Sequence, residues 1–440
     1  MVGITKMKAE KQKAEKEAFF CTTKELSRLG LEQIPTQFQS HKHLIYSSPA
    51  TLAFNSPGAE GFGVKRAGLA VPDSIMLIVA PGCCGRNTSL ISSMKEYNDR
   101  FYYLMMDETD IVTGRHLKKI PKAVEEICSV CPKKPSVVMI CITCVDALLG
   151  TDMERVCKKA EEQVEIPVRP CYMYALTREG RKPPMVHVRQ SLYSLLEPGK
   201  KKGNVVNLLG FFSPLVDDCE IYDLLHSAGV KTIHEISRCK DYMEYQTMSE
   251  ANFNLVLHHE ARFAAEDFHN RLQIPFIELR RLYQIDKIEN QYHALGNALG
   301  VVFCDEKYKK QAEDALEKFR QKCPDASFAI GECLNADPFE LSLALIRYGF
   351  SVPEIYGTIT VENFTYIRSL AKISPETKVF SNMEPTMIYY DPAKSDVNLA
   401  IGKDACYYHP DCPYVMWNGE EQPYGYAGVR RLFEQLLEVV

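Results

Sequence analysis

The sequence predicts an α/β protein built on parallel sheets. From about residue 72 onward, short apolar runs typical of buried strands alternate with amphipathic stretches typical of helices. This alternation favours parallel strands joined by right-handed helical crossovers. The chain has 440 residues, which exceeds the size at which one hydrophobic core keeps growing. We therefore expect several α/β domains of similar construction.

The expected elements follow from the spacing of the apolar residues. Strands are expected at 75–80, 101–106, 136–143, 204–209, 253–257, 326–330, 376–380, 397–401 and 413–417. Helices are expected at 117–129, 153–163, 218–228, 262–271, 306–322, 338–348 and 361–371. Residues 4–30 carry a charged pattern, which favours a solvated arm or a fraying helix.

Two breaks in this pattern suggest domain edges. A turn-rich, basic linker, Glu197-Pro-Gly-Lys-Lys-Lys-Gly203, leads into a new strand, and a mixed polar stretch near 284–300 precedes another. Three α/β units of about a hundred residues fit these edges and ordinary domain sizes. The expected parts are an N-terminal arm at 1–44, a cysteine-bearing domain at 45–200, a second at 201–295, a third at 296–405, and a C-terminal segment at 406–440 that packs back on the body.

Composition limits the function classes. Hydrophobic residues make up 46% and charged residues 25%, which is ordinary for a globular protein. The net charge of −5 argues against a nucleic-acid partner, which requires a basic surface. We expect no membrane span, and the charged N-terminus has no apolar core of a secretory signal. Sixteen cysteines fit reduced, mostly buried thiols better than a disulfide framework, so we expect a cytoplasmic protein.

Two cysteine sites follow two of the expected strands. Cys83 and Cys84 lie in Pro81-Gly-Cys-Cys-Gly85 after the strand at 75–80, and Cys144 follows the run at 136–143. Ligands of open parallel sheets gather beyond the carboxyl ends of the strands, and soft thiolates select zinc or iron–sulfur clusters. The pattern predicts a metal site at Cys84 and Cys144, with two buried thiols beside a tight turn as the alternative.

A second cysteine pattern invites a zinc-ribbon interpretation. Cys128 and Cys131 form one C-x-x-C pair, and Cys141 and Cys144 form another. The segment between the pairs is short and contains an expected buried strand. The four thiols are therefore poorly placed for a tetrahedral site.

Polar residues also follow later strands. His258 and His259 come directly after the strand at 253–257, where paired histidines can bind a metal, donate protons or hold an anionic substrate. The alternative is an ordinary surface or core histidine. Five residues lie just past strands of the third unit and could face the same crevice: Glu332, Cys333, Asn382, Glu384 and Lys403. The G-x-x-x-x-G-K-[ST] phosphate loop does not occur in the sequence, so another polypeptide would have to bind any ATP.

Taken in order, these segments resemble the nitrogenase component 1 superfamily, which includes nitrogenase subunits, nitrogenase-like tetrapyrrole reductases and cofactor-assembly scaffolds. The resemblance runs from about residue 45 to the C-terminus. The motifs that carry it are Pro81-Gly-Cys-Cys-Gly85, Met106-Asp-Glu-Thr-Asp-Ile-Val-Thr-Gly114, Cys144-Val-Asp-Ala-Leu-Leu-Gly-Thr-Asp152, Val206-Asn-Leu-Leu-Gly210, Gln273-Ile-Pro-Phe276 and Pro423-Tyr-Gly-Tyr-Ala-Gly428.

The resemblance implies three Rossmann-like domains around a central cleft and pairing with a second component 1-like subunit or with itself, as a homodimer or heterotetramer. It implies an iron–sulfur cluster at the subunit interface, either [4Fe-4S] or P-cluster-like. Cys84 and Cys144 match two of the family's cluster ligands, and Cys83 is a further cofactor-binding candidate. Electrons would come from a separate ATP-hydrolysing iron protein. A second metallocofactor in the cleft is possible.

The sequence also departs from the family pattern. The position of the first cluster cysteine falls in Ala53-Phe-Asn-Ser-Pro57, which has no thiol. Cys83 or Cys21 could substitute, or Asn55 or Ser56 could offer oxygen. The residue matching the cofactor's cysteine is His258, and the residue matching its histidine is Tyr424. The standard nitrogenase cofactor and dinitrogen reduction are therefore not expected.

On these grounds we expect an oxidoreductase subunit that passes electrons from an interface cluster to a substrate in the cleft. His258, His259 and Glu384 are the candidate catalytic residues, which would bind the substrate or supply protons. Two alternatives stay open: a non-catalytic scaffold for a metallocofactor, and a partner subunit that supplies half of an interface cluster. A metal-free metabolite-binding protein is a third.

Overall fold

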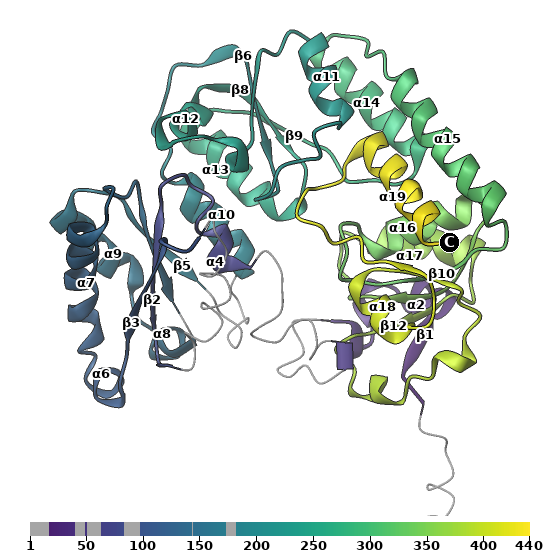
Figure 1. Cartoon of the computed structure of the whole chain (residues 1–440), viewed down its shortest axis with the longest axis horizontal. Helices are drawn as coiled ribbons and strands as arrows, with labels where there is room; N and C mark the ends of the chain where they lie inside the picture. The colour runs from purple at the N-terminus through teal and green to yellow at the C-terminus, as the bar shows by residue number, and fades with distance from the viewer. Residues whose placement is uncertain (1–16, 40–48, 51–62, 83–96, 143, 173–181) are drawn as a thin grey trace, which may run out of the picture.

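In the part of the chain that the structure describes, the strands form three sheets (Figure 1). The computed structural model describes residues 17–39, 49–50, 63–82, 97–142, 144–172 and 182–440. Every strand pair is parallel except the pairing of one short N-terminal strand. The expected α/β class with parallel sheets is therefore confirmed. Figure 1 shows the three units as an arc, with the second unit between the other two.

The first sheet has the strand order β3-β2-β4-β5. Its strands are β2 (Ile75–Ala80), β3 (Phe101–Met105), β4 (Val138–Ile142) and β5 (Val168–Tyr172). Its helices are α4 (Val64–Ala67), α6 (Glu108–Thr113), α7 (His116–Val130), α8 (Cys144–Leu149), α9 (Met153–Val164) and α10 (Pro184–Tyr193). Each residue of β2 is buried, as expected for a parallel strand covered on both faces. This continuous apolar run made the strand recognisable in the sequence.

The second sheet has the order β7-β6-β8-β9. Its strands are β6 (Lys202–Leu209), β7 (Thr232–His234), β8 (Ala251–Val256) and β9 (Phe276–Glu278). Its helices are α11 (Glu220–Ser227), α12 (Tyr242–Gln246) and α13 (Arg262–Leu272). Helix α13 packs against α10 of the first unit, and one hydrophobic cluster contains buried residues of both sheets. The first and second units therefore share a core.

The third sheet has the order β1-β12-β11-β10-β13-β14. Its strands are β1 (Phe20–Thr22), β10 (Ser327–Ile330), β11 (Ser351–Tyr356), β12 (Lys378–Phe380), β13 (Leu399–Ile401) and β14 (Tyr414–Val415). Its helices are α2 (Thr23–Leu29), α14 (Ile285–Leu299), α15 (Glu306–Lys322), α16 (Pro338–Arg347), α17 (Phe364–Ile373), α18 (Lys403–Tyr408) and α19 (Gly425–Val439). Strand β1 runs antiparallel to β12, and α2 packs on α17. The described part of the expected N-terminal arm thus belongs to this sheet.

The structure also differs from the expected elements. The polar stretch near 284–300 is helix α14, whose buried residues Ile285, Ile288, Tyr292 and Leu295 recur at helical spacing. Strands β5 and β11 were not expected; each contains a proline, which lowers the strand signal of a sequence. The proposed domain limits stay a prediction.

Helix α19 joins the second and third units. It packs against α11, α14 and α15, and the buried Glu220 carboxylate accepts hydrogen bonds from the backbone N–H groups of Tyr426 (2.5 Å) and Ala427 (3.0 Å) at the start of the helix. Gly425 has φ 59°, and a Cβ there would lie 1.9 Å from Glu220 Oε1. Only glycine allows this close approach.

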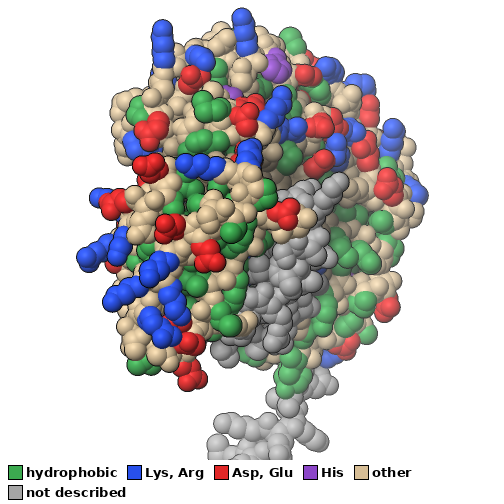
Figure 2. Space-filling model, turned by 60° about the vertical axis from the view of Figure 1, so that its left-hand side comes forward, with side chains coloured by type: hydrophobic (Ala, Val, Ile, Leu, Met, Phe, Trp, Pro, Cys, Tyr) green, Lys and Arg blue, Asp and Glu red, His purple; other side chains and the backbone are tan. Residues whose placement is uncertain are grey.

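The surface of the first unit carries mixed charge. Figure 2 shows basic and acidic side chains interspersed on this face, with hydrophobic side chains among them. Three exposed hydrophobic residues lie at or beyond the carboxyl ends of first-unit strands: Met105, which ends β3, Val112 and Leu149. Among the described residues, no helix has the length and apolar character that crossing a bilayer requires.

Candidate functional site

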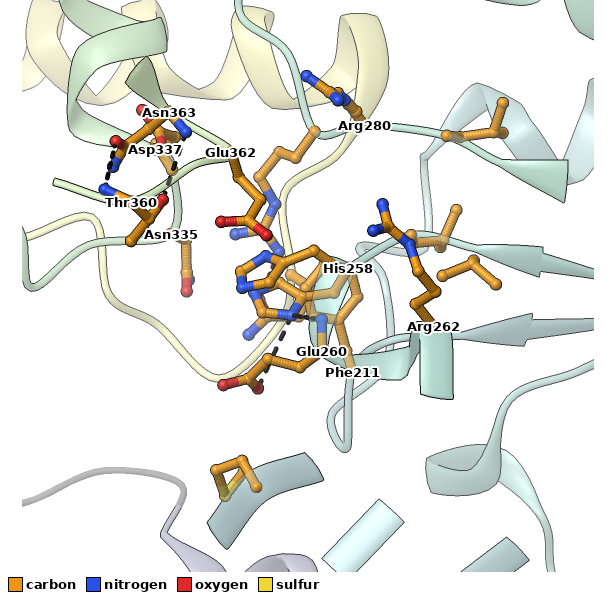
Figure 3. A pocket seen from close by; sticks show the side chains of 18 of the residues that line it. Phe211, His258, Glu260, Arg262, Arg280, Asn335, Asp337, Thr360, Glu362 and Asn363 are labelled. Atoms are coloured by element: carbon orange, nitrogen blue, oxygen red, sulfur yellow. Dashed lines mark hydrogen bonds and ion pairs between the residues drawn. The ribbon is translucent and has the colours of Figure 1, made fainter. Parts of the chain in front are cut away.

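A cavity of 480 Å³ lies between the carboxyl ends of the second and third sheets (Figure 3). Its lining comes from the loops that follow β6, β8 and β9 on one side, and from those that follow β10 and β11 on the other. Open α/β sheets bind ligands at this edge. The cavity is therefore the candidate binding site of the described structure.

His258 forms part of the cavity wall, directly after β8 and Leu257. Its ring lies edge-on to Phe211, with 5.7 Å between the ring centroids, and 4.4 Å from the His259 ring. Its Nδ1 accepts a long hydrogen bond of 3.4 Å from the Glu260 backbone N–H. At Gly210 a Cβ would lie 2.8 Å from the backbone nitrogen of His258. Because glycine has no Cβ, the ends of β6 and β8 can approach each other closely here.

The surroundings of His258 favour its neutral form. Burial lowers the pKa of His258 well below its ordinary value, and His259, Arg189 and Arg281 lower it further by charge repulsion. The imidazole is therefore neutral near pH 7, and a neutral imidazole nitrogen is a metal ligand rather than a proton donor. The structure thus brings His258 and His259 together at the cavity and argues against proton donation by His258.

The wall opposite the third unit is rich in arginine; Arg189 comes from α10 of the first unit, and the other arginines come from the second. Arg189 pairs with Glu260 at 2.8 Å, and Arg262 makes two bonds of 2.7 Å with Glu278. Arg280 and Arg281 also line the cavity. Two of the four arginines are thus neutralised by second-unit carboxylates, and the wall keeps an excess of positive charge.

The third-unit wall is made of acids and amides. It includes Glu332, Asn335, Asp337, Glu362 and Asn363. Burial raises the pKa of Glu332 and that of Asp337. Asp337 accepts hydrogen bonds of 3.0 Å from two backbone N–H groups at the start of α16, so this carboxylate caps a helix.

Behind this wall, Asp404 anchors the loop after β10. Its carboxylate accepts hydrogen bonds from the backbone N–H groups of Glu332 (2.8 Å) and Cys333 (2.9 Å) and from the Asn382 amide (2.6 Å). Of these residues, only Glu332 lines the cavity. Cys333 and Asn382, which were expected near the crevice, instead support the wall from behind through their hydrogen bonds to Asp404.

Glu384 is not brought to the cavity. Its carboxylate accepts a hydrogen bond of 3.3 Å from the Thr386 backbone N–H and caps a short 3-10 helix (Pro385–Tyr389). Glu384 is absent from the cavity lining among the residues that the structure describes. The sequence placed it past a strand end but could not show that the chain turns away there.

The structure describes only one of the three predicted cluster cysteines. Cys83 and Cys84 lie outside the described residues, as do Asn55 and Ser56. Cys144 is the first residue of α8. The strands that precede these sites are neighbours, because β2 pairs with β4 and Val79 lies opposite Ile142.

The remaining cysteines do not support a four-thiol zinc site. Cys131 ends α7 ahead of β4, Cys141 is buried inside β4, and Cys144 follows it. Over the described ranges, no group of three or more His, Cys, Asp or Glu could hold a metal ion. Cys21 lies in β1 of the third sheet, where burial raises its pKa to about 11.

One network near Cys144 was not foreseen. Asp146 of α8 bonds the buried His116 at 2.8 Å, and the other ring nitrogen of His116 lies 3.0 Å from the Asp110 carbonyl. Asp110 in turn pairs with Arg115 and Lys119, which hold the pKa of its carboxyl well below its usual range. These contacts fix the helix that begins with Cys144. A local sequence signal was lacking because the partners lie up to 30 positions apart.

The chain is similar to proteins named for cofactor assembly. It is 25% identical over 418 residues to the nitrogenase iron-molybdenum cofactor biosynthesis protein NifE of Sinorhizobium fredii, covering 89% of this chain and 82% of that protein. It is 25% identical over 284 residues to NifE of Nostoc sp., covering 61% of this chain and 58% of the relative. These names overturn the expected oxidoreductase: the relatives are biosynthesis proteins rather than catalytic reductases.

The fold is also that of nitrogenase structures. The structure of nitrogenase Cp1 at pH 6.5 superposes with a TM-score of 0.69 at 18% identity, covering 90% of this chain and 92% of that one. At this identity the likeness shows the fold alone. The sequence model of the family "Nitrogenase component 1 type Oxidoreductase" matches residues 60–440. The chain therefore belongs to the nitrogenase component 1 family.

Proposed function

We propose that this chain is a scaffold that holds a metallocofactor during its assembly and then releases it. The observation that carries the proposal is the cavity lined by a neutral histidine and several arginines. It is supported by relatives named for iron-molybdenum cofactor biosynthesis. The expected alternative of a non-catalytic scaffold is thus the better reading of the site.

The side chains of the cavity fit such a cargo. Iron–sulfur cofactors carry sulfide and are anionic overall, so an arginine-rich wall complements their charge. His258 offers an imidazole, which is a common ligand of iron. Among the described lining residues no cysteine is present, and a neutral imidazole attracts a metal less strongly than a thiolate does. A site built this way holds a cofactor and can still give it up.

We propose further that Cys84 and Cys144 supply an iron–sulfur cluster shared with a second component 1-like subunit or a second copy. The neighbouring strands β2 and β4 support this pairing. The exposed Met105, Val112 and Leu149 lie at or beyond the carboxyl ends of first-unit strands and offer an apolar surface for the partner. This proposed cluster site is additional to the cavity and does not form part of it.

The test of the scaffold function is a loading and transfer experiment. The chain is purified without oxygen after co-expression with a second component 1-like subunit and the cofactor-assembly proteins, and iron and acid-labile sulfide are measured. The loaded protein is then mixed with cofactor-free nitrogenase component 1, and the metal recovered on the acceptor is measured. We expect transfer without turnover; failure to load iron under these conditions would refute the proposal.

Three variants locate the metal. His258→Ala should lower the cavity-bound metal, whereas His269→Ala, which removes an exposed histidine of α13, should not. Cys144→Ala should remove about two irons per chain if a four-iron cluster is shared by two chains. Cavity metal that persists in His258→Ala at the level of the unaltered protein would contradict the assigned site.

A further inference from the structure

Arg281 differs from two other arginines of the cavity. Arg189 and Arg262 each pair with a carboxylate. Over the described residues, Arg281 has no ion pair with a carboxylate, and its Nε atom is buried without a hydrogen-bond partner. Placing an unpaired charge in a protein interior is costly. A group that is left uncompensated in this way is poised to gain energy from an anion that enters the cavity.

The guanidinium of Arg281 is held in one orientation. Its Cζ lies 4.3 Å above the centre of the Phe211 ring, and one terminal nitrogen donates a hydrogen bond of 2.6 Å to Gln422 Oε1. Burial lowers the pKa of Arg281, but an arginine stays charged near neutral pH because its ordinary pKa is above about 12. The Nε donor, which has no partner among the described residues, is therefore held in a fixed geometry.

Gln422 is fixed by the backbone around it. Its N–H donates to the Pro214 carbonyl at 2.9 Å, its carbonyl accepts from the Val216 N–H at 3.1 Å, and its side-chain amide donates to the Glu420 carbonyl at 2.7 Å. The segment Trp417–Tyr424, yellow in Figure 1, runs between the third unit and α19. Gln422 therefore orients Arg281 from this segment, which we call the strap and which is hydrogen-bonded to the second unit.

We propose that Arg281 is the anion-recognition residue of this cavity, and that Gln422 is its positioning residue. The inference rests on the proposed function and names the chemistry of the cargo: an anionic group that accepts hydrogen bonds from a guanidinium edge. A sulfide of the metal cluster and a carboxylate or oxyanion carried by an organic part of the cargo share this chemistry. The two sources are separated by experiment.

The first arm measures binding of free anions. Cargo-free full-length protein is titrated calorimetrically with malonate and, separately, with inorganic phosphate. Arg281→Gln should weaken the observed affinity about tenfold or more, as loss of a charge-assisted hydrogen bond predicts. Arg155→Gln removes the same charge from an exposed position on α9 and should leave the affinity unchanged.

Gln422→Glu separates recognition from folding. The new carboxylate would pair with Arg281 across the 2.6 Å contact and occupy it, so anion binding should be lost while the melting temperature stays equal or rises. A merely structural role of Gln422 predicts the opposite: loss of binding only together with loss of stability. Arg281→Lys, which keeps the charge but not the fork, should restore part of the affinity.

The second arm measures cofactor content after anaerobic co-expression. If free anions bind and Arg281→Gln abolishes this, the recognised group is a carboxylate or oxyanion. If free anions do not bind but Arg281→Gln and Gln422→Glu lower the retained iron severalfold, the recognised group belongs to the cluster. Both results support the inference.

The failures are distinguishable. If the unaltered protein and Arg281→Gln load equal amounts of iron and neither binds an anion, the role of Arg281 is overturned and the scaffold proposal stands. Arg281-dependent anion binding by a protein that never loads a cofactor overturns the scaffold and leaves the anion site. Protein that neither loads iron nor binds an anion overturns both.

Discussion

The two walls of the cavity use their polar groups differently. On the third-unit wall, the carboxylates of Asp337 and Glu332 accept hydrogen bonds from nearby backbone N–H and hydroxyl groups. On the second-unit wall, Arg281 keeps a donor without a partner among the described residues, and His258 is neutral. We therefore call the third-unit wall the rigid wall, and the second-unit wall, which would contact the proposed cargo, the binding wall. The comparison predicts that substitutions on the two walls will change different observables.

The largest effect should come from the support of the rigid wall. Asp404→Ala removes the acceptor of three hydrogen bonds and leaves two half-buried backbone N–H groups unsatisfied. The free energy of unfolding should fall by about 3 to 5 kcal/mol, measured by chemical denaturation. Asp411→Ala, at an exposed position, is the control. A small loss in Asp404→Ala would show that the wall does not depend on this carboxylate.

The pH dependence of stability tests Glu340 of α16, the helix behind this wall, whose carboxylate accepts hydrogen bonds from the backbone N–H groups of Tyr283 (2.9 Å) and Gln284 (3.4 Å). Burial raises the pKa of Glu340 from 4.5 to about 7, so between these values the native protein binds more protons than the unfolded chain. The contribution of Glu340 to the free energy of unfolding is therefore complete below pH 4.5 and is lost as the pH rises to 7, by roughly 3 kcal/mol in all. Glu340→Gln should remove this slope, measured as unfolding free energies from pH 4.5 to 7.5. An identical slope in both proteins would contradict the assignment.

The binding wall should respond in metal content and not in stability. His258→Ala should lower cofactor affinity about tenfold, in the range seen when supporting groups of metal sites are removed, while the free energy of unfolding changes by less than about 1 kcal/mol, since the ring is 34% exposed. Iron content and denaturation of the same preparation measure both. A large stability loss would place His258 with the rigid wall and erase the distinction.

The smallest effect is expected for Arg262→Gln. This arginine pairs with Glu278 at a position that is 42% exposed, and such ion pairs contribute about 0.5 kcal/mol. Because the pair is neutral as a whole, removing the arginine should also change anion binding less than Arg281→Gln does. An equal loss of anion affinity in the two variants would show that total charge, rather than one unpaired guanidinium, governs recognition.

Part of the cavity could be predicted from the sequence. The strand expected at 253–257 placed His258 and His259 at the cavity, and away from the cavity the run at 75–80 has the same bounds as β2. Continuous apolar runs bounded by polar residues carry this information locally. A position just past a strand was enough to predict cavity residues after β8, because the chain continues along the edge of the sheet there.

The rest depended on contacts that no local pattern encodes. Arg189 and Glu260 lie 71 positions apart and Arg281 and Gln422 lie 141 apart, so the sequence could not separate a paired arginine from an unpaired one. Glu384 followed a strand like His258 did, but its chain turns into a 3-10 helix capped by the same side chain. The expected oxidoreductase was wrong, because the relatives are named for cofactor biosynthesis.

The strap Trp417–Tyr424 has a consequence for how the cavity comes into being. It touches all three units: Glu420 pairs with Arg66 at 2.7 Å in the first, Gln422 holds Arg281 in the second, and the Trp417 carbonyl accepts from the Asn335 N–H in the third. Ribosomes make the chain from its N-terminus, so this segment emerges after every strand of the three sheets. A nascent chain can form its sheets before the cavity exists, and the cavity is completed only once synthesis has passed the strap.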